Sequence, residues 1–120
     1  MEITVSIYCI NCPISNMPIY VGKTENIDQR LTMHSNGNRQ TKIGLYIKKL
    51  RQNGLRPTFH ILEEFDYNSS RPVKEWMSII RESEAMEVYW IHQFRAWGFN
   101  LLNRMHNTHA VRRNWNYFNF

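Results

Sequence analysis

The sequence predicts an α/β (α+β) fold, in which a small three-stranded antiparallel sheet is flanked by helices in a single domain. Runs rich in β-branched and aromatic residues, typical of strands, occur at 2–10, 19–22 and 57–65. A loop rich in proline, serine and asparagine joins the first two runs, which favours an antiparallel hairpin. Segments with helical periodicity fill most of the remainder, and 120 residues suffice for one core.

The first two predicted strands place two tyrosines close together. Residues 2–10 (EITVSIYCI) contain Tyr8, and residues 19–22 contain Tyr20. In an antiparallel hairpin these tyrosines lie in neighbouring strands. We expect the chain to turn sharply at Gly22 and to continue into a helix.

The first helix is predicted to start near Asn26, a favourable N-cap residue with Gln29 three positions on, and to end near residues 36–37. One stripe of this helix combines apolar and polar side chains: Ile27, Arg30, Leu31 and His34. Arg30 and His34 therefore face the core. Taken alone, the pair favours a structural interpretation, in which the stem of Arg30 passes Leu31 and His34 is a hydrogen-bonded histidine at the edge of the core.

The second helix is predicted from about 41 to 53, with Gly54 as its terminator. Its buried stripe contains Ile43, Tyr46, Ile47 and Leu50. The outer side and the following loop carry basic residues, namely Lys42, Lys48, Lys49, Arg51 and Arg56. Such a run is usually a solvated face, although it could also follow a phosphate backbone.

The third and longest helix is predicted from about 73 to 97, after a polar loop at 66–71, with Pro72 suited to its first turn. Its buried stripe consists of Trp76, Ile79, Ile80, Trp90, Ile91 and Phe94. Glu87 falls within this stripe, and a carboxylate there is costly to bury unless a cation meets it. A structural ion pair, such as one with Arg30, and a metal ligand explain Glu87 equally well. Glu82 and Glu84 are interpreted as surface charges.

Composition favours a polyanionic partner. The formal net charge is +5 and the sequence pI is about 9.5. The N-terminus lacks the pattern of a signal peptide and no apolar run reaches membrane-spanning length, so we expect a cytoplasmic protein without a membrane partner. Cys9 and Cys12, with His106 and His109, offer an alternative zinc site, but a thiol within a strand is more often a small buried hydrophobe.

Residues 104–120 form a separate C-terminal tail after a predicted domain at 1–103. The tail interleaves arginines with aromatic residues, namely Arg104, Arg112, Arg113, Trp115, Tyr117, Phe118 and Phe120. This pattern suits base stacking with phosphate neutralisation, and equally a segment that docks on the sheet or on a second subunit.

An ordered set of short motifs spans about residues 3–103 and resembles the GIY-YIG nuclease superfamily. The set comprises Ser6-Ile7-Tyr8, Tyr20-Val21-Gly22, Arg30, His34, Glu87 ahead of Trp90-Ile91, and Gly98-Phe99-Asn100. Each motif is weak alone, but their order and spacing are fairly specific. The resemblance implies a small antiparallel sheet with flanking helices, in agreement with the elements predicted above, and hydrolysis of a DNA phosphodiester.

The resemblance also implies roles for the matching residues. Glu87 would hold one divalent cation, Mg²⁺ or Mn²⁺ in its place, because one carboxylate with waters and phosphate oxygens suits a hard ion. Arg30 would contact the scissile phosphate. Tyr8 would activate the attacking water, Tyr20 would position phosphate or water, and His34 would assist proton transfer. The division of labour between Tyr8 and His34 stays open, because a tyrosine with a pKa near 10 is a poor base.

Other residues complete the expected site. Asn100 matches the late asparagine of the family, which orients the site by hydrogen bonds, and Asn103 is the second choice. The expected DNA contacts are basic residues, namely Lys23, Lys42, Lys48, Arg112 and Arg113. With so little recognition surface, we expect relaxed sequence preference, or guidance by DNA structure, a targeting partner or a second copy of the chain.

The chain departs from the family pattern at three points. Ser6 replaces the usual first glycine, and Thr41 or Lys42 stands where some members carry another histidine. Many members also have a separate DNA-binding domain, whereas this sequence offers the tail. These departures keep an alternative open, a module of the same fold that binds nucleic acid without catalysis.

Overall fold

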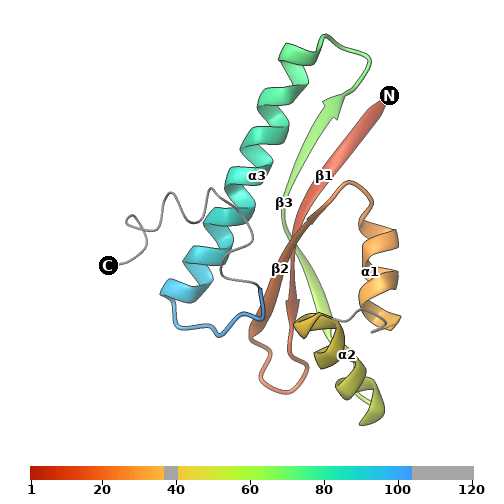
Figure 1. The fold of residues 1–120 in the computed structure, drawn as a ribbon, viewed down its shortest axis with the longest axis vertical. Coiled ribbons are helices and arrows are strands. Elements are labelled where there is room, and N and C mark those ends of the chain that lie inside the picture. Colours follow the sequence, from red (N-terminus) through yellow and green to blue (C-terminus); the bar gives the residue numbers. More distant parts are fainter. Residues whose placement is uncertain (37–40, 104–120) are drawn as a thin grey trace.

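The central element is β1 (Glu2–Asn11), which pairs with a strand on each side. The computed structural model describes residues 1–36 and 41–103, and within them β2 (Pro18–Thr24) and β3 (Thr58–Asn68) complete a three-stranded sheet in the order β2-β1-β3. Both pairings are antiparallel, as predicted (Figure 1). The six residues from Val5 to Ile10 are all buried, because side chains cover both faces of this strand.

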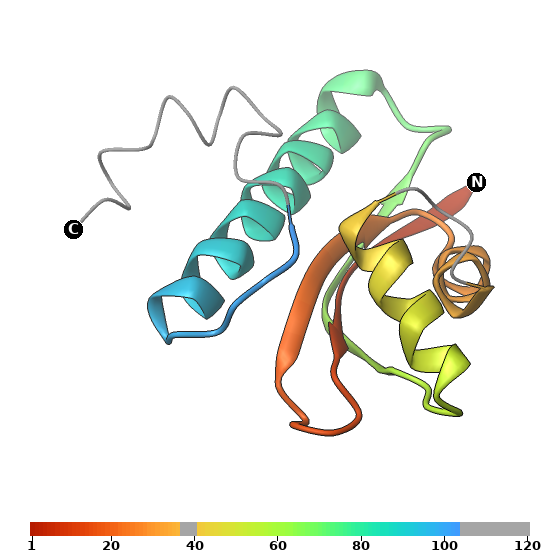
Figure 2. The same cartoon turned by 60° about the horizontal axis from the view of Figure 1, so that its bottom comes forward.

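The two faces of the sheet are covered by different helices. α3 (Val73–Ala96) lies on one side, whereas α1 (Ile27–Asn36) and α2 (Lys42–Gln52) lie on the other (Figure 2). Ile7 and Cys9 belong to the core under α3. Tyr8 and Ile10 belong to the core under α2. The alternation of a β-strand thus directs Tyr8 away from α3 and toward the two shorter helices.

Local signals start and end the short helices as predicted. The Asn26 side-chain oxygen accepts a hydrogen bond from the backbone N–H of Gln29 at 3.1 Å, which caps α1. The Thr41 hydroxyl accepts one from the backbone N–H of Gly44 at 3.1 Å, which caps α2. After α2 the chain reaches a φ of +71° at Gly54, a conformation that a glycine adopts without strain. Because of these caps α1 can present Arg30 and His34 one turn apart.

α3 buries its predicted stripe against the sheet. The side chains of this stripe are all half-buried or buried, with Phe94 7% exposed. The Trp90 indole N–H donates to the Glu63 carboxylate at 2.9 Å, which joins α3 to β3 one turn beyond Glu87. Among the described residues no helix, α3 included, is both long and apolar enough to cross a membrane.

Two strands extend further than predicted. β2 runs through Gly22 to Thr24, and β3 continues into the predicted polar loop as far as Asn68. The cause lies in pairing with β1, since Thr24 lies opposite Ser6 and Tyr67, which is buried, lies opposite Ile3. Ladder hydrogen bonds and burial outweigh the local preference of polar residues for loops. At the start of α3, Pro72 is the N-cap residue and not part of the first turn.

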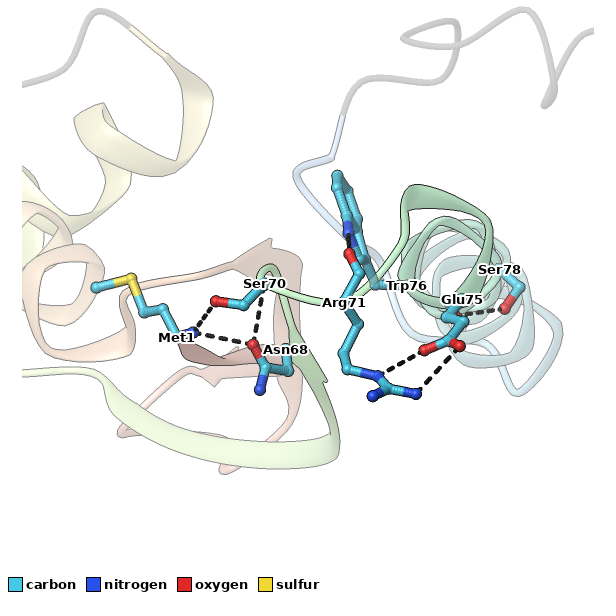
Figure 3. A network of polar contacts seen from close by, with 7 residues as sticks. All are labelled: Met1, Asn68, Ser70, Arg71, Glu75, Trp76 and Ser78. Atoms are coloured by element: carbon cyan, nitrogen blue, oxygen red, sulfur yellow. Dashed lines mark hydrogen bonds and ion pairs between the residues drawn. The ribbon is translucent and has the colours of Figure 1, made fainter.

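The connection between β3 and α3 is held by a polar network (Figure 3). The Met1 amino group donates to Asn68 Oδ1 at 2.9 Å and to Ser70 Oγ at 2.8 Å. The Trp76 indole N–H donates to the Arg71 carbonyl at 3.0 Å, and the Trp76 ring stacks on Tyr67 with centroids 5.6 Å apart. These contacts fix the direction in which α3 leaves the sheet, and with it the position of Glu87.

Candidate active site

Three aromatic side chains from three elements form a buried group on the α1–α2 face. Tyr8 is 0% exposed, and its hydroxyl oxygen lies 2.8 Å from Nε2 of His34, which is 3% exposed. The Tyr20 ring lies 5.5 Å from the His34 ring and 6.4 Å from the Tyr8 ring, between centroids. The hairpin and the stripe of α1 thus bring together residues that the sequence predicts separately.

Gly22 makes room for this group. The sheet register places Gly22 opposite Tyr8, and a Cβ atom at position 22 would overlap the hydroxyl and ring atoms of Tyr8. The sequence suggests a sharp turn at Gly22, but the structure shows a strand residue whose missing side chain lets Tyr8 reach His34 across β2. The predicted turn is therefore wrong, and close approach explains this glycine.

Burial raises the pKa of Tyr8 well above its ordinary value. The neighbouring Tyr20 adds to the increase, the Arg30 guanidinium opposes it by charge and by a hydrogen bond, and Glu87 contributes a smaller increase. Tyr8 is consequently a neutral phenol near pH 7, and its O–H can donate to His34 when Nε2 carries no proton. The hydrogen bond places the Arg30 guanidinium beside the tyrosine, whereas Glu87 acts on it only through its charge.

A cleft of about 450 Å³ opens between the start of α1 and the middle of α3, across the end of β2. Its lining residues are Val5, Lys23, Thr24, Glu25, Asn26, Gln29, Arg30, Ile80 and Ser83. Arg30 is half-buried there, one turn before His34 on α1. A guanidinium in a cleft of this size can bind one phosphate with two of its donors.

Glu87 is half-buried on α3, and burial raises the pKa of its carboxyl. Lys23 and Arg30 oppose this increase, whereas Glu84 adds to it. Lys23 lies 3.7 Å from the carboxylate of Glu84, which is largely exposed. Among the described residues no cation forms an ion pair with Glu87 itself, so the structural pair with Arg30 considered above is not formed.

The donor set suits a lightly held hard cation. Among the described residues no three His, Cys, Asp or Glu side chains are grouped closely enough to hold a metal by themselves. A single half-buried carboxylate matches the way Mg²⁺ is bound, through one or two carboxylates, waters and substrate phosphates. Burial disfavours the ionised form of the Glu87 carboxyl, so a bound cation would stabilise that form. Glu87 therefore fits a divalent ion that binds together with substrate.

The two late asparagines have different surroundings. Asn100, the first choice from sequence, is exposed. Asn103 accepts a hydrogen bond from the backbone N–H of Val21 at 2.9 Å and donates one to the Val21 carbonyl at 2.7 Å. Leu102 N–H donates to the Ile19 carbonyl at 2.7 Å, so this segment extends the edge of β2 beside Tyr20. Asn103 is thus hydrogen-bonded to β2 next to Tyr20, whereas Asn100 lies on the surface.

Sequence reasoning missed Ser83. This residue is 0% exposed, lines the cleft, and donates from its hydroxyl to the Ile80 carbonyl at 2.6 Å. It lies one turn before Glu87 on the same side of α3, where a small side chain lets the helix approach the sheet. The signal was available as a small polar residue between Ile80 and Glu87 on an otherwise apolar stripe.

The remaining predicted residues lie in different parts of the molecule. Lys23 lines the cleft, whereas Lys42 and Lys48 lie on the exposed side of α2. Ser6 is buried and keeps the strand register opposite Thr24. Cys9 and Cys12 are buried free thiols, and burial raises the pKa of Cys9 to about 11. Other predicted residues lie outside the described part of the chain, namely His106, His109, Arg112 and Arg113.

Comparison with known proteins agrees with this geometry. The family model of the GIY-YIG catalytic domain matches residues 5–103, which include both tyrosines, Arg30, His34 and Glu87. Neither the curated proteins nor the solved structures gave a match. Because the family model covers nearly the whole chain, this protein belongs to the GIY-YIG catalytic domain family, a family of nuclease type.

Proposed function

We propose that this protein is a metal-dependent DNA endonuclease that hydrolyses phosphodiester bonds. The observation that carries the proposal is the convergence of Tyr8, His34, Arg30 and Glu87 from β1, α1 and α3. Hydrolysis of a phosphodiester needs a group that activates water, a cation that stabilises charge on the phosphorane-like transition state, and a metal ligand. Tyr8 with His34, Arg30 and Glu87 are the candidates for these three requirements.

Water activation is assigned to Tyr8 and His34 acting together. Because burial keeps Tyr8 protonated, the tyrosine cannot act as a preformed base near pH 7. In the proposed step the Tyr8 oxygen accepts a proton from water while its own proton passes to Nε2 of His34, along the 2.8 Å contact. The water oxygen then attacks phosphorus and the bond to the leaving oxygen breaks. This relay is the division of labour that we propose for Tyr8 and His34, which sequence left open.

Arg30 is assigned to the scissile phosphate. It lines the cleft and lies near the Tyr8 hydroxyl, so a phosphate that it binds stands close to the activated water. Its planar set of donors can pair with two phosphate oxygens, and that pairing strengthens as negative charge accumulates in the transition state. Tyr20, packed against His34, is assigned to positioning the phosphate or the water.

Glu87 is assigned as the protein ligand of one divalent cation, most suitably Mg²⁺, with Mn²⁺ as a substitute. When bound, the ion supplies Lewis-acid stabilisation of charge on the phosphate and the leaving oxygen. The protein's own contribution is a carboxylate on α3, one turn beyond the cleft-lining Ser83, on which the charges of Lys23 and Arg30 act.

The test is cleavage of plasmid and branched DNA in the presence of Mg²⁺ or Mn²⁺. Cleavage should be abolished by Glu87→Ala and by Arg30→Ala, with circular dichroism showing that both variants fold. Activity that survives in both folded variants would contradict the assigned roles. Zinc analysis of the purified protein separately tests the alternative zinc site.

The alternative, a nucleic-acid-binding module without catalysis, rests on the replacement of the family's first glycine by Ser6. The structure accommodates Ser6 without interrupting β1 or displacing Tyr8. Salt-sensitive DNA binding without metal-dependent turnover on any tested DNA would favour this alternative.

A further inference from the structure

The charges of this chain are strongly segregated along the sequence. Between Asp28 and Glu63 there is no acidic residue, but there are seven basic ones, namely Arg30, Arg39, Lys42, Lys48, Lys49, Arg51 and Arg56. The stretch from Glu63 to Glu87 contains seven of the ten acids, namely Glu63, Glu64, Asp66, Glu75, Glu82, Glu84 and Glu87. In the structure the basic stretch contains α1 and α2, and the acidic stretch contains most of β3 and α3. The helices that cover the two faces of the sheet therefore differ in charge.

The outward side of α2 combines exposed lysines with a position next to the candidate site. Ile43 and Ile47, on the inward side, belong to the same buried cluster as Tyr8. A helix with its side chains is about 10–12 Å across, so the outward side lies about one helix diameter beyond the Tyr8–His34 pair. Lys42, Lys48 and Lys49 are exposed on that side, and no ion pair with them occurs in the described residues.

The spacing of these lysines suits a nucleic-acid backbone. Lys42 and Lys49 are two helical turns apart, which is about 10 Å along the axis. This distance corresponds to about three phosphates along the axis of one strand of B-DNA. By contrast, α3 has Glu75, Glu82 and Glu84 exposed beside its lysine and arginines, so its outer side offers a phosphate backbone little net attraction.

We propose that duplex DNA is held on one side of the scissile phosphate only, with its backbone along the outward side of α2. The inference rests on the proposed nuclease function for the position of the scissile phosphate. The partner follows from charge complementarity between the lysines of α2 and phosphates, and the one-sidedness follows from the acids of α3 on the other side of the cleft. A duplex that extended over α3 would meet glutamates where α2 offers lysines.

The deciding experiment compares two double variants that remove the same charge from the two sides. Lys48→Gln/Lys49→Gln changes α2, and Lys74→Gln/Arg81→Gln changes exposed residues of α3. Each is combined with Glu87→Gln to prevent cleavage, and binding to a fluorescent linear duplex is measured between about 50 and 200 mM salt. The α2 variant should reduce the slope of log K against log salt by about 1.8, which is the value for two phosphate contacts. The α3 variant should leave the slope unchanged.

Equal losses in both variants, no loss in the α2 variant, or no salt-dependent binding by the Glu87→Gln parent would overturn the proposal. A loss confined to α2 without any cleavage by the wild-type protein would support DNA binding along α2, and the nuclease function and the position relative to a scissile phosphate would fail. Where cleavage occurs, a footprint of the metal-free protein adds a second measurement. Protection on one side of the cleavage position is expected, and equal protection on both sides would contradict the one-sided arrangement.

Discussion

The two faces of the central sheet satisfy their polar groups in different ways. On the α1–α2 face, Tyr8 and His34 are almost fully buried and contact each other at 2.8 Å. On the α3 face, Glu87 is half-buried on the apolar stripe of α3, and no ion pair reaches it in the part of the chain that the structure describes. The first arrangement is satisfied within the fold. The second has no ion-pair partner among the described residues, and the proposed function assigns it a cation.

This difference indicates where stability and function conflict. A buried hydrogen-bonded pair contributes to stability, or costs little. A buried carboxylate whose pKa is raised by burial opposes folding whenever it is ionised. We therefore expect substitutions on the first face to affect fold and catalysis together, and substitutions of Glu87 to affect them in opposite directions.

The largest effect is expected for Glu87→Gln. The cleavage rate should decrease by at least about 10³-fold, because the only assigned protein ligand of the metal is lost. The metal-free variant should nevertheless be more stable than wild type at pH 7, by on the order of 1 kcal/mol. Burial raises the Glu87 pKa above its ordinary 4.5, so wild-type stability should decrease as the pH rises through that raised value. Thermal melts from pH 4 to 8 measure this effect.

The matched control for this prediction is Glu84→Gln, on the same helix. Glu84 is exposed and pairs with Lys23, so cleavage should stay close to that of wild type. A short DNA alone should raise the melting temperature of all three proteins, whereas a further increase on adding Mg²⁺ should occur in wild type and the control but not in Glu87→Gln. If Glu87→Gln were less stable than wild type in metal-free buffer, the proposed difference between the two faces of the sheet would be wrong.

The next effect concerns the Tyr8–His34 pair. Tyr8→Phe should reduce the cleavage rate by about 10²–10⁴-fold, the usual contribution of a proton-transfer group. Since Tyr8 stays neutral well above pH 7 and passes its proton to His34, the wild-type rate should level off above neutral pH. Initial cleavage rates of the wild-type protein from pH 7 to 9.5 test whether the rate levels off. A tenfold increase per pH unit across that range would instead indicate a preformed tyrosinate as the base.

A smaller effect is expected for Gly22→Ala. The added methyl group would collide with Tyr8, and overpacking of this kind costs about 1–3 kcal/mol. Gly54→Ala, at a φ of +71°, should cost about 1–2 kcal/mol but leave cleavage unchanged, because nothing lies within 4 Å of the added atom. Urea unfolding and cleavage assays on both variants separate the two effects. Equal activity of the two variants would show that the approach of Tyr8 to His34 is not needed.

The smallest effect distinguishes the two asparagines. Asn103→Ala removes two hydrogen bonds to Val21 and should destabilise the protein by about 1–3 kcal/mol, with a partial loss of cleavage. Asn100→Ala changes an exposed residue and should stay within about 0.5 kcal/mol of wild type. If Asn100→Ala alone reduced cleavage, the role predicted from sequence would belong to Asn100 after all.

Local patterns were sufficient to predict most elements of the fold. The N-cap Asn26, the start of the second helix near 41 and the stripe of α3 were predicted because capping and helical periodicity depend on residues a few positions apart. The ends of β2 and β3 were predicted too short, since Thr24 and Tyr67 are held in strands by partners on β1. Strand length depends on pairing with distant residues, which a local pattern does not contain.

The sequence by itself determined which chemical groups are present, and that Arg30, His34 and Glu87 lie on apolar stripes. Only the tertiary structure decided how these groups meet. The register of β1 against β2 places Gly22 beneath Tyr8, and the packing of α1 brings His34 to the tyrosine hydroxyl. The docking of residues 101–103 on β2 fixes Asn103 next to Tyr20 and leaves Asn100 exposed. Periodicity specifies the face of an element, whereas register and docking, which join distant segments, specify the distances on which a site depends.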